Sequence, residues 1–581
     1  MSTFQLTEEQ LAVIDHVCTS PSSLQVRALA GAAKTTTIEH AIRQRGGVGV
    51  LAIAFNKKIA TALAEKLPME AVCMTLNAMG HRAWGSYIKN KLYLDTSKTY
   101  HILNGVMNAE HVHEEEFLEV AANLRGLVTA AKVAGLVPTG CKGEQFSRCF
   151  FADTEENWER LGETYDCDVN ADYIRMAREA LRIGISQAFA GTIDFNDQIY
   201  MSTCWEAPFA QFPLVVVDEA QDLSQLNHHM IAKCIARGGK LVAIGDPYQS
   251  IYAFRGADTS SMDLLQARFK METLELNTTF RCSKAVAEHV RPYVPHIRSP
   301  GWARKGAVRY HEALDLAAIP VGSAIICRNN KPLMQMAYKF IKAGRPVVLN
   351  GGDFGEQLIK LLRKVAGATS KSEAQNDRLL KAMDTAALLK AVKVWEEKEI
   401  AIAQAKNKAY RVSGIEDKAG SLRVVIQSCK GRNAADILAE LRQLFENKVG
   451  SVILSSGHKS KGLEWEQVYH LNAHLCPSKY SIRALEEAEM MIEDWEVAGG
   501  GNGAHLPLPD NLVRSLELAR AAIQQENNLK YVISTRAKNS LHYINLPKEE
   551  KNDEDAVDSH CGMDAVEYDI DTEPKIRGEA R

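Results

Sequence analysis

The chain has 581 residues, of which 46% are hydrophobic and 24% charged, an ordinary balance for a globular protein. No stretch holds the roughly 18 consecutive apolar residues of a membrane-spanning helix, and the first residues lack the basic and apolar segments of an export signal. The twelve cysteines include no C-x-x-C pair, which excludes the common zinc and iron–sulfur signatures. We therefore expect a soluble, cytoplasmic protein with reduced cysteines.

The net charge of −3 is unevenly distributed along the chain. Residues 549–581 hold twelve Asp or Glu against four Lys or Arg, and they contain too few apolar residues to fold alone, so we expect a disordered acidic tail. The remaining residues carry a small positive excess, which is compatible with a locally basic groove for nucleic acid.

Short β-branched runs in the chain have the pattern of buried parallel strands, each followed by a loop or a helix. The first set lies at 24–30, 49–55, 214–220 and 240–246, and the residues from about 84 to 185 are mainly helical in pattern. The second set lies at 307–313, 323–329, 345–351, 451–457 and 541–547, with a helical interruption from about 351 to 448. We therefore expect an α/β protein with two parallel sheets.

This order of runs predicts two α/β domains, each divided by a mainly helical insertion. The predicted parts are a first domain at 1–83 and 186–275 with its insertion at 84–185, a second domain at 276–350 and 449–548 with its insertion at 351–448, and the tail at 549–581.

The stretch RALAGAAKTTTIEHA, residues 27–41, is similar to a phosphate-binding loop that follows a strand and opens a helix. Lys34 would contact the β- and γ-phosphates, and Thr35 would bind the magnesium ion. Ala33 occupies the position of the usual second glycine. That change costs about 1–3 kcal/mol if the backbone needs a positive φ, and much less otherwise.

A second motif, the acidic sequence DEAQD after an apolar run, strengthens this interpretation. The apolar run before DEAQD predicts a buried strand that delivers Asp218 and Glu219 to its carboxyl end. Asp218 would bind magnesium, and Glu219 would orient or deprotonate the attacking water. The alternative without a catalytic role is that the acidic residues of this motif cap a helix.

Seven further motifs are spread along the chain: QLTEEQLAVI, AFNKKIA, TLNAMGHRAW, IGDPYQSIYAFRGAD, NTTFRC, SSGHKSKGLEWEQV and ENNLKYVISTRAKNSL. With these motifs the sequence resembles superfamily 1 DNA helicases of the UvrD/Rep type, and most of all the helicase core of the F-box DNA helicases. The resemblance extends from about residue 4 to residue 547. It implies two RecA-like P-loop NTPase domains, with ATP and Mg²⁺ as cofactors.

The resemblance implies roles for individual residues. The implied catalytic residues are Lys34, Asp218, Glu219, Gln249, Arg281 and Arg536, and the implied nucleotide-binding residues are Gln10, Ala30, Gly31, Ala32, Ala33, Lys34, Thr35, Thr36, Phe280 and Glu464. Gln10 would read the adenine, Phe280 would stack on it, and Glu464 would bind the ribose. The two arginines would reach across a cleft as guanidinium fingers. Outside this context, a surface ion pair would be the better interpretation of either arginine.

The implied DNA-binding residues are Phe55, Asn56, Lys57, Thr75, Asn77, His81, Tyr252, Phe254, Arg255, His458 and Lys459. The aromatic members would stack on exposed bases, which is worth about 1–3 kcal/mol per base and tolerates any sequence. A single aromatic residue is more often part of a core, so only the set as a whole favours nucleic acid.

Together these features favour an ATP-dependent DNA helicase or translocase that moves on single-stranded DNA, 3′ to 5′ by analogy with UvrD and Rep. It would unwind duplex or displace bound protein in replication, repair or recombination, acting at single-strand and junction DNA beside replication or recombination proteins. The alternatives are a nucleotide-gated single-strand-binding protein with weak or no unwinding, and an RNA motor.

Overall fold

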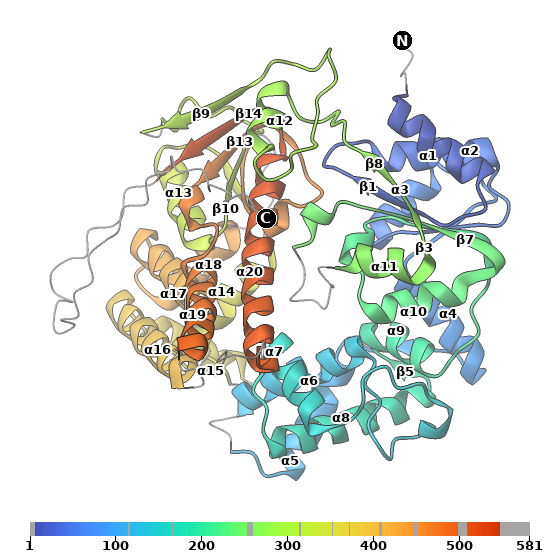
Figure 1. Ribbon diagram of the computed structural model, residues 1–581. Helices are drawn as coiled ribbons and strands as arrows, with labels where there is room; N and C mark the ends of the chain where they lie inside the picture. Colours follow the sequence, from blue (N-terminus) through green and yellow to red (C-terminus); the bar gives the residue numbers. More distant parts are fainter. Residues whose placement is uncertain are drawn as a thin grey trace. The chain divides into compact units, whose positions relative to one another are not determined.

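Two six-stranded parallel sheets organise the chain (Figure 1). The computed structural model describes residues 6–113, 117–165, 167–251, 260–312, 315–350, 352–370, 372–405, 410–444, 451–497 and 508–545. Met1–Asn545 form one unit and Leu546–Arg581 another. The second unit, with the predicted acidic tail, lies outside the described residues. In the described part, no helix is both long and apolar enough to cross a bilayer.

The first sheet has the strand order β3-β2-β6-β7-β1-β8. Its strands are β1 (Leu24–Ala28), β2 (Val50–Ile53), β3 (Val72–Met74), β6 (Phe212–Val217), β7 (Ile235–Gly245) and β8 (Glu272–Leu276). One face is covered by α1 (Glu8–Thr19), α2 (Lys34–Arg45) and α3 (Lys57–Ala64), and the other by α4 (Leu76–Ile88), α10 (Gln225–Cys234) and α11 (Ser261–Phe269). Because helices cover both faces, most residues of the central strands β1, β2 and β6 are buried.

The first insertion is a helical unit with its own hydrophobic cluster. It contains α5 (Lys98–Ala109), α6 (Phe117–Ala134), α7 (Glu155–Tyr165) and α8 (Ala171–Phe189), and the short strands β4 (Tyr93–Leu94) and β5 (Thr192–Ile193) pair beside it. Helix α9 (Phe195–Cys204) follows and packs against α4.

A buried ion network joins this insertion to the start of α9. Lys98 lies 2.6 Å from Asp197, and Lys132 lies 2.7 Å from both Asp194 and Asp197. Asp194 also caps α9, because its side chain accepts a hydrogen bond from the backbone N–H of Asp197. Two ammonium groups and two carboxylates balance each other, so the charges are compensated although they are out of water.

The second sheet has the strand order β11-β12-β10-β13-β14-β9. Its strands are β9 (Ala307–His311), β10 (Ala324–Cys327), β11 (Val347–Asn350), β12 (Val452–Ser456), β13 (Trp465–Leu471) and β14 (Ala537–Ile544). The associated helices are α12 (Lys284–Val290), α13 (Asn330–Lys342), α19 (Lys479–Trp495) and α20 (Asp510–Ser534), and the second insertion contributes α14 (Gly352–Val365), α15 (Glu373–Ala382), α16 (Thr385–Ala405), α17 (Tyr410–Ser428) and α18 (Ala434–Leu444).

The predicted fold class is confirmed: two parallel α/β sheets, each interrupted by helices. Three strands of these two sheets were not anticipated. β3 and β8 are short edge strands with partly exposed side chains, and β13 begins with the exposed or half-buried residues Trp-Glu-Gln before its buried part. Such strands give a weak apolar signal.

Some of the predicted domain limits fall inside helices or strands, and one falls at the end of a strand. Residue 83 lies inside α4, residue 185 inside α8 and residue 275 inside β8, whereas residue 350 ends β11. The limit at 448 lies outside the described residues. Continuous helices therefore lead into and out of the first insertion, and the division of the chain into domains stays a prediction.

Candidate functional site

The loop between β1 and α2, residues 29–33, has a backbone conformation that suits anion binding, and we call it the phosphate-type loop. Two of its residues have left-handed backbone conformations: Gly31, with φ 75°, and Ala33, with φ 57°. Helix α2 begins at Lys34, so its first N–H groups lie without helical partners at the loop, where they attract negative charge. Ala33 is thus in the conformation in which a side chain is strained, at a cost of about 1–2 kcal/mol.

Gly31 is required by a close approach between two parts of the chain. A Cβ on Gly31 would lie 2.5 Å from the Cβ of Arg281 and 2.7 Å from Oγ1 of Thr279. The backbone N–H of Phe280 donates to the carbonyl of Gly31 at 2.9 Å. The segment that follows β8 is therefore held directly against the phosphate-type loop.

The carboxyl end of β6 delivers two buried carboxylates beside Lys34. The ammonium of Lys34 lies 3.2 Å from Glu219, and the backbone N–H of Glu219 donates to Asp218. Burial and the charge of Glu219 raise the pKa of Asp218. Burial opposes ionisation of Glu219, but Lys34 and Lys461 outweigh it and hold its pKa below the usual range. Asp218 is thus the carboxylate in greater need of a cation.

A cavity of about 820 Å³ gathers residues from both sheets. It is lined by Gly31, Ala32, Ala33, Lys34, Thr35, Thr36, Asp218, Glu219, Gln249, Phe280, Arg281, Glu464 and Arg536, among others. This size is in the range of small-ligand pockets. All six predicted catalytic residues and eight of the ten predicted nucleotide-binding residues lie on its wall.

The two arginines reach the cavity by different routes. Arg281 donates to Glu464 at 2.7 Å, and Glu464 also pairs with Lys538 at 2.8 Å. Arg536 is buried, donates to the carbonyls of Val532 and Leu463, and approaches the Gln249 side-chain oxygen at 3.5 Å. Burial and the nearby Arg281 lower the pKa of Arg536 to about 10, so it stays charged at neutral pH.

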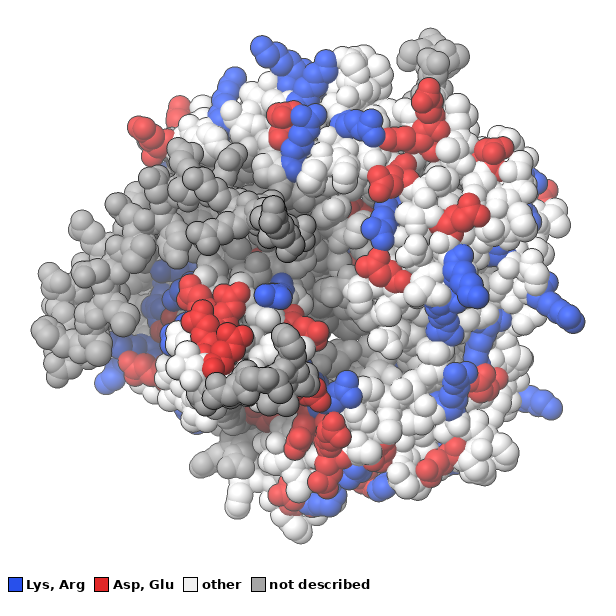
Figure 2. Space-filling view, in the orientation of Figure 1, with Lys and Arg blue, Asp and Glu red and all other residues white. Residues whose placement is uncertain are grey.

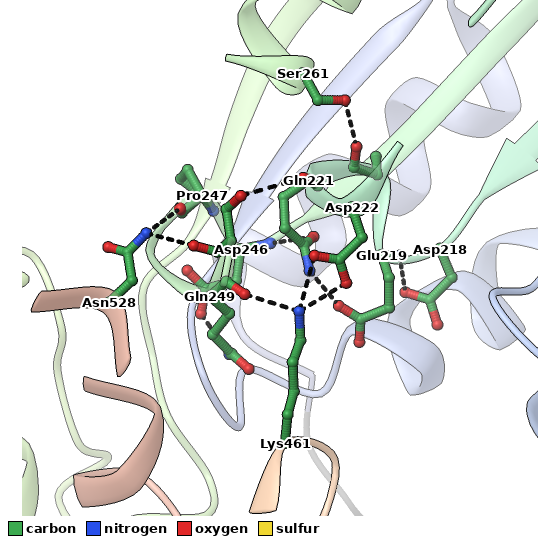
Figure 3. Close-up of polar contacts among 12 residues, drawn as sticks. Asp218, Glu219, Gln221, Asp222, Asp246, Pro247, Gln249, Ser261, Lys461 and Asn528 are labelled. Carbon is green, nitrogen blue, oxygen red and sulfur yellow. Dashed lines mark hydrogen bonds and ion pairs between the residues drawn. The ribbon is translucent and has the colours of Figure 1, made fainter. Parts of the chain in front are cut away.

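A lysine that the motif roles did not single out bridges the two sheets. Lys461 donates to both carboxylate oxygens of Asp222, at 2.7 and 3.0 Å, and to the backbone carbonyl of Gln249 at 2.8 Å (Figure 3). Burial raises the pKa of Asp222 to about 6 although Lys461 opposes the shift. The pair is a buried contact between the segment after β12 and the segments after β6 and β7.

Further bridging contacts come from the last turns of α20. The hydroxyl of Tyr531 accepts from the backbone N–H of Ala30 at 2.9 Å and donates to Asp246 at 3.2 Å. Asp246 also accepts from the side chain of Gln249 at 2.6 Å. Asn528 donates to the carbonyl of Ser250 at 2.9 Å. The phosphate-type loop is therefore in direct contact with the second sheet's longest helix.

Comparison with known proteins agrees with this geometry. Residues 6–270 match the UvrD/REP helicase N-terminal domain. Those residues are similar to the UvrD/Rep helicases. The chain is also 22% identical to F-box DNA helicase protein 1 of Schizosaccharomyces pombe over 80% of its length and 52% of that protein's. The predicted resemblance to superfamily 1 helicases, including the F-box DNA helicases, is confirmed.

Other relatives point the same way. F-box DNA helicase 1 of Gallus gallus is 22% identical over 81% of this chain and 44% of its own length, and the ATP-dependent DNA helicase PcrA of Bacillus subtilis is 24% identical over 42% of this chain. The chain thus spans about half the length of the F-box helicases that it matches.

Within this UvrD/Rep-type site, Gln10 does not line the cavity. Its side chain is 1% exposed, accepts from the backbone N–H of Thr7 and donates to Thr37 at 3.0 Å. Gln10 therefore caps α1 and fixes it against α2. Ala30, the other predicted contact that is absent from the cavity wall, is covered by Tyr531.

The sparse set of oxygen ligands fits magnesium. In the described residues, no three His, Cys, Asp or Glu side chains form a metal-binding group. Asp218 and Thr35 share the cavity wall. One carboxylate and one hydroxyl are typical of a Mg²⁺ ion that takes its other ligands from phosphates and water. The donor set thus suits a nucleotide-bound Mg²⁺ rather than an all-protein cage.

The predicted DNA-binding residues are not gathered at one place. Phe55 and Asn56 line the same cavity as the phosphate-type loop, and Lys57 opens α3. His458 lies on a separate cavity of about 300 Å³, and Lys459 is its neighbour in a short 3₁₀ turn. Tyr252, Phe254 and Arg255 lie outside the described residues.

The remaining three DNA candidates lie at the start of α4. Thr75 caps the helix, Asn77 donates to the carbonyl of Phe195 at 2.8 Å, and His81 contacts Gln198 on α9. Phe195 itself is 55% exposed, and sequence reasoning missed it because the residue sits between polar neighbours. An exposed aromatic ring at the first residue of a helix, beside these polar groups, is a further candidate for base stacking.

Proposed function

We propose that the protein is an ATP-dependent DNA helicase or translocase that hydrolyses ATP at this cavity and moves on single-stranded DNA. The observation that carries the proposal is the cavity itself, because it joins Lys34, Asp218 and Glu219 of one sheet to Arg281 and Arg536 of the other. A site shared by two lobes can open and close, and the grip on a strand can change with each closure. The match of residues 6–270 to the UvrD/REP helicase N-terminal domain supports the same activity.

The chain's own groups divide the work of phosphoryl transfer. Lys34 and the N-terminus of α2 bind the phosphates, Glu219 accepts the proton of the attacking water, and Arg281 and Arg536 stabilise the charge that develops. Magnesium, held through Asp218 and Thr35, would neutralise phosphate charge when bound. Gln249 contacts Arg536 and shares Asp246 with Tyr531, so it would report the state of the γ-phosphate to both lobes.

The DNA side of the proposal rests on less concentrated features. On the face shown in Figure 2, Lys and Arg are interspersed with Asp and Glu rather than gathered in one basic patch. Stacking and local contacts would therefore contribute more than bulk charge. Movement from 3′ to 5′, action on junctions, and a role in replication, repair or recombination are carried over from the UvrD/Rep resemblance.

ATP hydrolysis with and without single-stranded DNA tests the proposal. We expect DNA to stimulate turnover, and Lys34→Ala to abolish it, because the loop loses its only ammonium on the phosphates. Strand displacement on 3′-tailed and 5′-tailed duplexes then gives the direction, with an RNA strand as the comparison for an RNA motor. Wild-type protein that binds ATP but does not hydrolyse it with either strand would contradict the motor.

One observation favours the second candidate, a nucleotide-gated single-strand-binding protein. Ala33 is in the left-handed region, so the loop carries strain where other P-loops have glycine. That protein would show ATP-dependent changes in strand affinity without duplex separation. The displacement assay distinguishes the two.

A further inference from the structure

One wall of the cavity is aromatic, and only one of its two rings, Phe280, lies in a helicase motif. Phe280 and Trp302 both line the cavity, and their rings stack with centroids 6.2 Å apart and planes at 24°. Gln10, expected to read the base, is buried elsewhere. The cavity therefore offers a base the rings of Phe280 and Trp302, and not the side-chain amide of Gln10.

Trp302 is unusually exposed for a large aromatic residue. Its relative exposure is 75%, and Trp residues are on average highly buried. The ring contributes little to a hydrophobic core, since it packs on the partly buried Phe280 at the cavity rim. An exposed ring on a pocket wall is better explained by a ligand than by folding.

The position of Trp302 is nevertheless fixed by the backbone around it. Lys284 and Ala285 donate their backbone N–H groups to the carbonyls of Arg304 and Lys305, and the N–H of Ala303 donates to Pro300. Gly306 packs so closely on Ser283 that a Cβ there would lie 2.0 Å from its hydroxyl oxygen. The turn that carries the indole is thus anchored on α12, while the ring stays open to solvent.

The aromatic pair is also tied to the phosphate-type loop. The backbone N–H of Phe280 donates to Gly31 at 2.9 Å, and the N–H of Thr279 donates to Arg298 at the start of the Trp302 turn. Both rings therefore belong to the same rigid surroundings as the loop. Because Lys34 and both rings line one cavity, a nucleotide bound through its phosphates at Lys34 would share that cavity with the rings.

We propose that Trp302 stacks on the base of the bound nucleotide, with Phe280 behind it, and that this contact makes the site prefer purine over pyrimidine triphosphates. The inference rests on the proposed nucleotide function. Stacking grows with ring area and needs no hydrogen bonds to base edges, so a purine gains more than a pyrimidine. Trp302 is thus a residue for binding and base preference, separate from the groups that act on the phosphates.

Calorimetric titration with ATP, CTP and inorganic tripolyphosphate in the presence of magnesium tests this. We expect Trp302→Ala to weaken ATP binding about tenfold, in line with the usual worth of a stacked base, to reduce the ATP-over-CTP preference, and to leave tripolyphosphate binding unchanged. Trp302→Phe should keep most of the affinity. Indole fluorescence should change with ATP but not with tripolyphosphate, and Trp302→Phe should remove that change.

The matched control is Tyr310→Ala. Tyr310 is another exposed aromatic of the same lobe, 72% exposed and stacked on Tyr543, but it does not line the cavity. The Tyr310→Ala variant should bind ATP, CTP and tripolyphosphate as the wild type does. Equal loss of ATP and tripolyphosphate binding in Trp302→Ala, or no loss at all, would overturn the inference.

The wild type alone separates this inference from the proposed function. Tripolyphosphate that binds as tightly as ATP would overturn base stacking and leave the phosphate site intact. Wild-type protein that binds neither probe would overturn both.

Discussion

Ala33 places backbone strain in the loop that precedes α2. With φ at 57°, its methyl group is strained where glycine would not be. The loop still places Lys34 and Thr35 on the cavity wall. The cost lies in stability and not in geometry, as expected when a strained residue is held by its surroundings.

Ala33→Gly should therefore stabilise the protein. Relief of strain exceeds the extra freedom that glycine gives the unfolded chain, so we expect a gain of roughly 0.5–1 kcal/mol in the free energy of unfolding. Urea denaturation followed by circular dichroism measures it. The matched control is Ala32→Gly at the preceding residue, whose φ is not positive. It should lose stability, and a gain in both variants would contradict the strain.

His470 predicts how stability depends on pH. Its ring is fully buried on β13 without a hydrogen-bond partner for either nitrogen, and burial lowers its pKa to about 3. The unfolded chain takes up a proton below its ordinary pKa of 6.5, whereas the folded protein does not. Stability should thus be full above pH 6.5 and fall with pH toward 3, by about 2 kcal/mol at pH 5.

Denaturation midpoints between pH 8 and pH 5 measure this loss, and His470→Leu should make the curve flatter. The control is His474→Gln, an exposed residue of the same lobe. A wild-type curve no steeper than that of His470→Leu would rule out His470 as the source.

At the scale of elements, the ion network between the insertion and α9 is the least replaceable contact. Lys132 is buried and touches both Asp194 and Asp197. Lys132→Met would leave two buried carboxylates with one ammonium between them, so we expect a loss of about 3–5 kcal/mol in the free energy of unfolding. Urea denaturation measures it.

The control for this variant is Arg175→Met, which breaks the exposed pairs with Glu110 and Asp172. Exposed pairs contribute little, so its denaturation midpoint should stay near the wild-type value. Equal shifts in the two variants would contradict the importance of burial.

The elements also show what sequence patterns can and cannot predict. β2, β6 and β7 were visible because their buried parts are apolar runs, and β1 was visible because the mainly apolar run LQVRALA leads into a loop. β13 was not, although it is central in its sheet, because Glu466 and Gln467 interrupt the apolar residues at its start and only the later residues are buried. Edge strands such as β8 were missed for a related reason, since one side of each faces water.

At the scale of the whole molecule, one hydroxyl links the phosphate-type loop to the other lobe. Tyr531→Phe keeps the ring but leaves the N–H of Ala30 and the carboxylate of Asp246 without that partner. We expect the stimulation of ATP hydrolysis by DNA to fall several-fold, with basal hydrolysis largely kept. The control is Tyr543→Phe, whose hydroxyl bonds His289 within its own lobe. Unchanged stimulation in Tyr531→Phe would show that the contact carries no coupling.

The same scale marks the limit of sequence reasoning about the site. Lys34, Asp218 and Arg536 were identifiable because each lies in a motif with a known chemical task. Three further residues contact partners that are distant in the sequence: Lys461 contacts Asp222, Tyr531 contacts Ala30, and Trp302 contacts Phe280. The spacing of residues along the chain does not predict such contacts. Gln10 illustrates the converse, since a matching motif did not place its side chain on the cavity.

The strand order of the first sheet has a consequence for synthesis on the ribosome. β1 lies between β7 and β8, which follow it by more than two hundred residues. At the usual rate of translation, β1 waits for roughly 10 to 40 s before either neighbour has been made. During that interval a strand whose partners on both sides are missing is exposed to other nascent chains, so chaperone supply should influence the yield of this protein more than its final stability does.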